Sequence, residues 1–115
     1  MTMKKILFFL LTMCCSLAAW GDNIVFADAN VKALCVANWD TNGDGELSEE
    51  EAAAVTNLNN VFKSNTTISS FTELQFFTGL VSINMDDFYS CPNLTSIIVP
   101  NNVETIGMFA FYNCI

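Results

Sequence analysis

FTELQFFTGLVSINMDDFYSC, residues 71–91, matches LTSIIVPNNVETIGMFAFYNC, residues 94–114, without a gap. Six positions are identical in the two stretches, and four more are apolar in both. The identical pairs are Thr72 and Thr95, Ile83 and Ile106, Met85 and Met108, Phe88 and Phe111, Tyr89 and Tyr112, and Cys91 and Cys114. The apolar pairs are Phe71 and Leu94, Leu74 and Ile97, Phe76 and Val99, and Leu80 and Val103. The two members of every pair are separated by the same interval, and this 23-residue pattern indicates an internal repeat of one structural unit.

A repeat of about 20 to 29 residues with short β-prone runs is typical of a leucine-rich-repeat solenoid. Each unit buries its apolar face only by stacking on its neighbours. In the second copy, Leu94, Ile97 and Val99 form a strand-like alternation, and we expect Ile106 and Phe111 to point inward. The first copy begins with FTELQFF and looks more helical, as a first or capping repeat often does.

The number of visible repeats is small for such a fold. Solenoids of this kind usually need at least about three repeats, and the 23-residue pattern shows two. We therefore expect this chain to be the front of a longer protein. The alternative is a complete small α+β protein in which the repeat is a coincidence.

A second pattern, DTNGDGELSEEE, occupies residues 40–51. Calcium takes about six to eight oxygen ligands, which a twelve-residue loop supplies from positions 1, 3, 5, 7, 9 and 12. Those positions hold Asp40, Asn42, Asp44, Glu46 through its backbone carbonyl, Ser48 directly or through a water, and Glu51 through both carboxylate oxygens. Gly45 at position 6 allows the sharp turn. The pattern predicts one Ca²⁺ site of EF-hand type, and the alternative is a solvated acidic turn without metal.

Two short helices are expected on either side of this loop. Asp28 can cap a helix over residues 29–39, and Ser48 with Glu51 forms a capping box for a helix over residues 48–57. Paired EF-hands brace each other through position 8, which is Leu47 here. Since no second loop is present, we expect Leu47 and the two helices to dock on the first repeat turn. A lone loop with three charged ligands predicts weak calcium affinity, with a dissociation constant of roughly 10⁻⁴ to 10⁻³ M.

The N-terminus has the three parts of a secretory signal peptide. Lys4 and Lys5 precede an apolar run over residues 6–19, and small residues follow up to Gly21. This run is shorter than the roughly 18 residues that a membrane span needs, although an uncleaved anchor and a lipid anchor at Cys14 remain alternatives. The predicted organisation is a signal peptide over 1–21, a helix-loop-helix cap over 22–65 and leucine-rich repeats over 66–115.

Composition excludes several classes of function. Without residues 1–21, two lysines face all twelve acids, which gives a net charge of −10. Phosphate backbones would repel such a surface, so nucleic-acid binding is not expected. The chain contains no His and no Arg. Because the common general base is missing and no nucleophile or phosphate-loop pattern occurs, we predict that the protein is not an enzyme.

The remaining cysteines and aromatic residues have mainly structural interpretations. Cys91 and Cys114 lie at equivalent repeat positions, where a disulfide is conceivable, but buried reduced thiols are the preferred interpretation. Cys35 is expected in the core. Most periodic aromatic residues should also be core, whereas Phe109 replaces Asp86 in the repeat and is the best candidate for an exposed contact.

From Phe88 onward, the sequence FYSCPNLTSIIVPNNVETIGMFAFYNC resembles the BspA-type leucine-rich repeats, whose usual form is F-x-x-C-x-x-L-x-x-I-x-[IV]-P-x-x-V-x-x-I-[GA]-x-x-A-F. The matching residues are Phe88, Cys91, Leu94, Ile97, Val99, Pro100, Val103, Ile106, Gly107, Ala110 and Phe111. The region from Asn30 to Leu80 also resembles the N-terminal region of exported surface proteins of anaerobic, gut-type bacteria. The resemblance implies cell-surface display, binding of a protein that could belong to a host or its matrix, and no enzymatic activity.

The sequence therefore predicts an α+β protein in which an EF-hand-like helix-loop-helix precedes the start of a leucine-rich-repeat solenoid. Its expected function is adhesin-like protein binding at the bacterial cell surface or outside the cell, with one structural Ca²⁺. Two alternatives belong to other classes: a calcium-dependent assembly module of dockerin type, and the N-terminal region of a larger exported enzyme. Dockerins carry two such loops, and residues 52–115 contain no second one.

Overall fold

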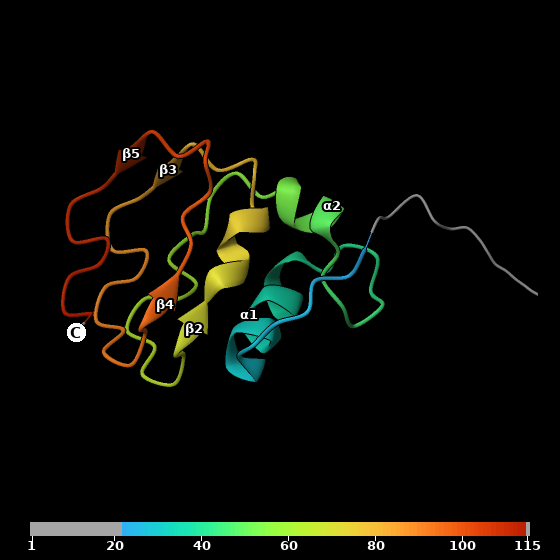
Figure 1. Ribbon diagram of the computed structural model, residues 1–115, viewed down its shortest axis with the longest axis horizontal. Coiled ribbons are helices and arrows are strands. Elements are labelled where there is room, and N and C mark those ends of the chain that lie inside the picture. The colour runs from blue at the N-terminus through green and yellow to red at the C-terminus, as the bar shows by residue number, and fades with distance from the viewer. Residues whose placement is uncertain (1–21, 115) are drawn as a thin grey trace, which may run out of the picture.

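The computed structural model describes residues 22–114 (Figure 1). The predicted signal peptide lies outside them. The element order is α1 (Ala29–Trp39), α2 (Glu49–Ala53), β2 (Ser70–Phe71), the 3₁₀ helix η3 (Thr72–Phe76), β3 (Ser82–Ile83), β4 (Ser96–Ile97) and β5 (Thr105–Ile106). Figure 1 shows the two α-helices at one end of a stack of chain turns and the C-terminal turn at the other. Within the described residues, no helix is long and apolar enough to cross a membrane.

Helix α1 has the bounds that the sequence predicts. The Asp28 side chain accepts a hydrogen bond from the Asn30 backbone N–H, which caps the first turn. Val31 and Cys35, one helical turn apart, are fully buried. Helix α1 therefore starts at its cap and turns one face to the core.

Helix α2 starts as predicted but ends early. Ser48 and Glu51 form the complete capping box, since each side chain accepts from the other's backbone N–H. The sequence predicts an end near Asn57, but the helix ends at Ala53. Val55 already bonds to the carbonyl of Ala52, a tighter 3₁₀ turn. The β-branched and Asn residues that follow have low helix propensity, which explains the early end.

The repeats pair through two short parallel strand contacts. Strand β3 pairs with β5, so that Ile83 lies opposite Ile106, as the repeat pattern predicts. Strand β2 pairs with β4 differently: Phe71 lies opposite Ile97, and the predicted match of Phe71 with Leu94 is wrong. The first turn has three extra residues between its strands, where η3 forms.

A third turn precedes the two that the 23-residue pattern shows. Phe62 stacks on Phe88 with ring centroids 5.3 Å apart, and Phe88 stacks on Phe111 at the same distance. The backbone repeats as well, because Ser64, Ser90 and Asn113 all have positive φ angles of 55–63°. Phe62 falls within the residues that we assigned to the cap, yet it begins this column of rings.

Close backbone contacts hold the turns together. The N–H of Gly107 donates to the carbonyl of Ile83 at 2.7 Å, and a Cβ on Gly107 would lie 2.6 Å from the Met85 nitrogen. Only glycine allows this approach. Ile83 is fully buried under the next turn, but Ile106 is 56% exposed because no described turn covers it. Ile106 takes the register position of the buried Ile83, so its inward orientation stays a prediction.

The three cysteines of the described residues are free thiols, as preferred from the sequence. The Cys91 thiol donates to the carbonyl of Phe62 at 2.9 Å, and the Cys114 thiol donates to that of Phe88 at 3.0 Å. Each thiol thus bonds to the preceding turn rather than to the other. Burial, with a smaller contribution from the charge of Glu73, raises the pKa of Cys35, as expected of an inert core thiol.

Below, residues 22–57 are called the cap and residues 58–114 the repeat region. One continuous core runs through both, from Ile24 to Ala110. Carboxylates of each part bond to the backbone of the other: Asp28 accepts from the Ser69 N–H at 2.6 Å, and Glu73 accepts from the Ala27 N–H at 3.1 Å. Helix α2 packs against η3, which agrees with the expectation that the helices dock on the first repeat turn.

Candidate functional site: the acidic loop and the Trp39 pocket

The acidic loop folds around its own side chains. The carboxylate of Asp40 accepts from the N–H groups of Gly43 and Gly45 at 3.0 and 2.8 Å. The hydrogen bond from the Gly45 N–H is the largest influence on the pKa of Asp40 and lowers it. Desolvation opposes this, and the N–H groups of Gly43 and Asp44 add to the lowering. Gly45 has φ +81°, the left-handed conformation expected at the sixth position. The Asp40 carboxylate thus bonds to the backbone at two glycines of the loop.

Three predicted ligands meet at this loop. Oxygens of Asp40, Asp44 and Glu51 lie within 4.8 Å of one another. Calcium–oxygen distances are about 2.3–2.6 Å, so ligands on opposite sides of one ion are separated by about 5 Å. The spacing of the three carboxylates therefore fits a calcium ion.

Hydrogen bonds already occupy the Glu51 carboxylate. Its Oε2 accepts from the N–H and hydroxyl of Thr41 and from the N–H of Asn42, and its Oε1 accepts from the N–H of Ser48. A carboxylate offers about four acceptor positions, two on each oxygen, so the Oε2 of Glu51 is crowded while its Oε1 accepts one bond. A bidentate calcium contact from Glu51 would have to replace some of these donors, and this lowers the affinity expected for the site.

The other three predicted ligands are placed differently. The Asn42 Oδ1 accepts from the Asp44 N–H, and the Glu46 carboxylate pairs with Lys32 at 2.9 Å. This ion pair is compatible with a role for Glu46 through its carbonyl alone. The buried Ser48 hydroxyl accepts from the Glu51 N–H as the helix cap. The Ser48 hydroxyl therefore already serves as the N-cap of α2.

Leu47 has a partner that the sequence analysis missed. Its carbonyl accepts from the Ile24 N–H at 2.8 Å, and the Glu49 N–H donates to the Asp22 carbonyl. Asn23 and Ser48 form an antiparallel bridge. The segment 22–24 therefore pairs with the end of the loop, where a second loop would pair in a double EF-hand, while the Leu47 side chain is fully buried in the common core.

Aromatic and methionine side chains of the last two turns are exposed. Met85 and Met108 are 57% and 68% exposed, and Phe109 and Tyr112 are 49% and 54% exposed. We call Tyr89, Phe109 and Tyr112 the aromatic patch: Tyr89 stacks on Tyr112, and Phe109 meets both edge-to-face. Phe109 is exposed as the sequence predicts, and its role in a contact stays a prediction.

The backbone at Phe109 is strained. Its φ angle is +62°, as at the equivalent Asp86 (+67°) and Asn60 (+58°). Asp and Asn tolerate this conformation, whereas it is uncommon for a bulky residue. The last turn therefore holds an exposed aromatic ring where smaller residues would be less strained, a feature that is common at functional sites.

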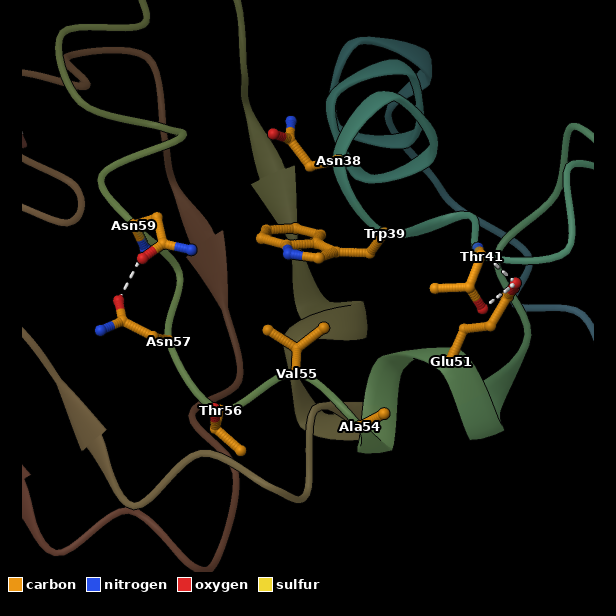
Figure 2. A pocket seen from close by; sticks show the side chains of 9 residues that line it. All are labelled: Asn38, Trp39, Thr41, Glu51, Ala54, Val55, Thr56, Asn57 and Asn59. Atoms are coloured by element: carbon orange, nitrogen blue, oxygen red, sulfur yellow. Dashed lines mark hydrogen bonds between the residues drawn. The ribbon is translucent and has the colours of Figure 1, made fainter.

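A pocket of about 260 Å³ lies beside the acidic loop (Figure 2). Its lining residues are Asn38, Trp39, Thr41, Glu51, Ala54, Val55, Thr56, Asn57 and Asn59. Figure 2 shows the indole of Trp39 in the middle, with Thr41 and Glu51 on one side and Asn57 and Asn59 on the other. The sequence analysis missed this pocket, because its residues come from α1, the loop and the segment after α2.

Comparison with known proteins identifies the repeats. Residues 55–115, just over half of the chain, match the family described as BspA type leucine rich repeat region (6 copies). No curated protein and no solved structure matches. The match starts at Val55, which includes the early turn that carries Phe62. Together with the stacked turns, this match shows that the chain belongs to the BspA-type leucine-rich-repeat family.

Proposed function

We propose that this protein is exported to the cell surface, where its repeats bind another protein in the manner of an adhesin. Leucine-rich repeats generally mediate protein–protein interactions, and the family match brings the chain into this group. The proposal assigns the chain no catalytic activity. Export rests on the predicted signal peptide over residues 1–21.

The observation that supports binding best is the aromatic patch, of which Phe109 and Tyr112 are exposed, together with the exposed Met85 and Met108 of the same two turns. Aromatic residues and Met are enriched in protein interfaces. An exposed apolar cluster of this kind is often an interaction site. The strained φ of Phe109 adds to this, since Asn or Asp would fit the turn more easily.

Binding to a panel of purified extracellular-matrix proteins tests this part of the proposal. The full chain is compared with Phe109→Asn, which removes the ring and relaxes the turn, and with Val25→Asn, a control at an 89% exposed residue of the cap. We expect at least a tenfold weaker interaction for Phe109→Asn only. Binding that is equal in both variants, or no binding to any matrix protein, contradicts the proposal.

The second part of the proposal is one structural calcium ion in the cap. Asp40, Asp44 and Glu51 would hold it with their side chains, together with Asn42, the Glu46 carbonyl and Ser48 or a water beside it. The ion would neutralise clustered carboxylates and fix the loop. Because Glu51 has to exchange hydrogen bonds for the ion, we expect a dissociation constant of roughly 10⁻⁴ to 10⁻³ M. Titration calorimetry measures it, and a micromolar or tighter site would favour a calcium sensor instead.

A further inference from the structure

We propose that the Trp39 pocket binds one neutral sugar ring, such as the terminal pyranose of a glycan. This inference does not depend on protein binding by the repeats, and the pocket shares one residue, Glu51, with the proposed calcium site. The inference rests on the shape of the pocket, on the aromatic ring within it and on the kinds of polar groups around it.

The rings of Phe62 and Phe77 pack against the Trp39 ring. Its centroid lies 5.5 Å from that of Phe77 in an edge-to-face contact, and 6.1 Å from that of Phe62. Both phenylalanines are fully buried, whereas Trp39 is only partly buried. The core thus fixes an aromatic surface at the pocket. The faces of aromatic rings are electron-rich, and the C–H bonds on one side of a pyranose carry the complementary partial positive charge.

The polar groups of the pocket are almost all neutral. The chain has a net charge of −8, yet Glu51 is the one charged residue among the nine that line the pocket. Its carboxylate is already occupied by backbone N–H groups and the Thr41 hydroxyl. The pocket therefore offers no cation for an anionic ligand, and its one carboxylate is directed to the backbone of the acidic loop.

Three exposed asparagines line the pocket, and internal bonds orient two of them. The Asn38 Nδ2 donates to the Leu34 carbonyl at 2.8 Å, which leaves its Oδ1 as an acceptor for a ligand. The Asn57 Oδ1 accepts from the Asn59 N–H at 2.8 Å, which leaves its Nδ2 as a donor. Asn59, with φ +56°, is held at the edge of the pocket by this turn. Neutral donors and acceptors at fixed positions suit the hydroxyl groups of a sugar.

The volume sets the size of the ligand. Pockets for drug-sized molecules usually measure about 300–1,000 Å³, and the Trp39 pocket is slightly smaller at about 260 Å³. One sugar ring fits this limit better than a longer segment of an oligosaccharide or a folded protein surface. A peptide would place backbone and side chains of several residues there, so the observations favour a sugar.

A glycan array followed by titration calorimetry tests the inference. The full chain is applied to the array, and the terminal monosaccharide of the best-bound glycan is then titrated into the parent and the variants. Asn38→Ala removes a pocket acceptor from an exposed helical position, and Trp39→Phe shortens the aromatic surface but keeps the core contacts. Asn101→Ala, at an exposed asparagine of the repeat region, is the matched control.

We expect about tenfold weaker binding for Trp39→Phe and about fivefold weaker binding for Asn38→Ala, which corresponds to one stacking contact and one hydrogen bond. Asn101→Ala should bind like the parent. In a Trp20→Phe background, where Trp39 is the remaining tryptophan, the sugar should also shift the fluorescence emission. Thermal melts establish that each variant is folded.

Three results would overturn the inference. One is a folded parent chain that binds no glycan on the array. Another is glycan binding that Trp39→Phe and Asn38→Ala leave unchanged, which would place the sugar elsewhere. The third is competition for the pocket by a peptide and not by any sugar, detected as a shift in Trp39 emission.

Discussion

The cap and the repeat region are held together in different ways. In the cap, carboxylates of Asp28, Asp40 and Glu51 accept hydrogen bonds from backbone N–H groups. In the repeat region, aromatic rings of successive turns stack in a column of Phe62, Phe88 and Phe111. Backbone hydrogen bonds also join one turn to the next. The stability of the cap should therefore depend on pH and on cations. The stability of the repeat region should depend on how closely its side chains pack.

The largest effect is expected in the ring column. Phe88 is fully buried and contacts Phe62, Phe71 and Phe111, so that Phe88→Ala leaves a cavity between two turns. We expect a loss of about 3–5 kcal/mol in the free energy of unfolding, measured by urea denaturation. The control Phe109→Ala, at a half-exposed ring, should change it by less than about 1 kcal/mol. Equal losses would contradict the ring column as the main support.

The next effect separates the two regions by pH. Burial raises the pKa of Asp28, but the N–H groups of Ser69 and Asn30, with smaller contributions from the Ser69 hydroxyl and the Ser70 N–H, outweigh it and lower the pKa overall. Since the folded pKa is below the unfolded one, this carboxylate stabilises the fold above the unfolded pKa of about 4 and loses that effect as the pH falls through the folded pKa.

Asp28→Ala should accordingly cost about 2–3 kcal/mol at pH 7, because it removes the helix cap and the link to Ser69. The difference between variant and parent should shrink as the pH falls below about 4. Urea denaturation at a series of pH values measures it. A difference that stays constant down to pH 2 would show that the charge of Asp28 contributes nothing.

A smaller effect is expected where the cap and the repeat region meet. A Cβ on Gly79 would lie 2.5 Å from the Ala53 carbonyl oxygen and 2.9 Å from that of Val55. Gly79→Ala should therefore push α2 away from the first repeat turn, at a cost of about 1–3 kcal/mol. Thermal unfolding by circular dichroism tests this, with Thr78→Ala as a neighbouring control at an exposed side chain. Unchanged melting of Gly79→Ala would show that this contact is not needed.

An effect of similar size is expected at the calcium loop. With a dissociation constant of roughly 10⁻⁴ to 10⁻³ M, 10 mM Ca²⁺ should stabilise the parent by about 1.4–2.7 kcal/mol. Calcium should not stabilise Asp40→Ala. In chelator, the free energy of unfolding of this variant should differ from that of the parent only by the loss of the two bonds from Asp40 to the loop backbone. The same concentration of Mg²⁺ is the control for ionic strength. Equal stabilisation of parent and variant by Ca²⁺ would exclude the loop as the site.

Local signals in the sequence predicted local structure well. Asp28 and the pair Ser48 and Glu51 are capping residues, and both helices start where these residues place them. The 23-residue pattern predicted the stacking of Phe88 on Phe111, since β3 and β5 pair in the same register. The meeting of Asp40, Asp44 and Glu51 also follows from the loop pattern alone.

Features that depend on contacts distant in sequence were not predictable. An alignment without gaps cannot reveal the three extra residues around η3. It therefore pairs Phe71 with Leu94 instead of Ile97, and it does not show the earlier turn that contains Phe62. The pairing of Ile24 with Leu47 leaves no sequence signal, because any residue could supply the backbone groups. The exposed side of Trp39 depends on how Phe62 and Phe77 cover the other side.

Hydrogen exchange of the backbone amides in calcium and in chelator tests the contrast between the two regions most directly. Calcium should slow exchange in residues 40–51 and in residues 22–24, which pair with the end of the loop. Amides around Phe88 and Phe111 should exchange equally in both buffers. Equal exchange of the loop with and without calcium, or the same calcium effect throughout the repeat region, would contradict a cation-dependent cap on a repeat region that is held by stacking.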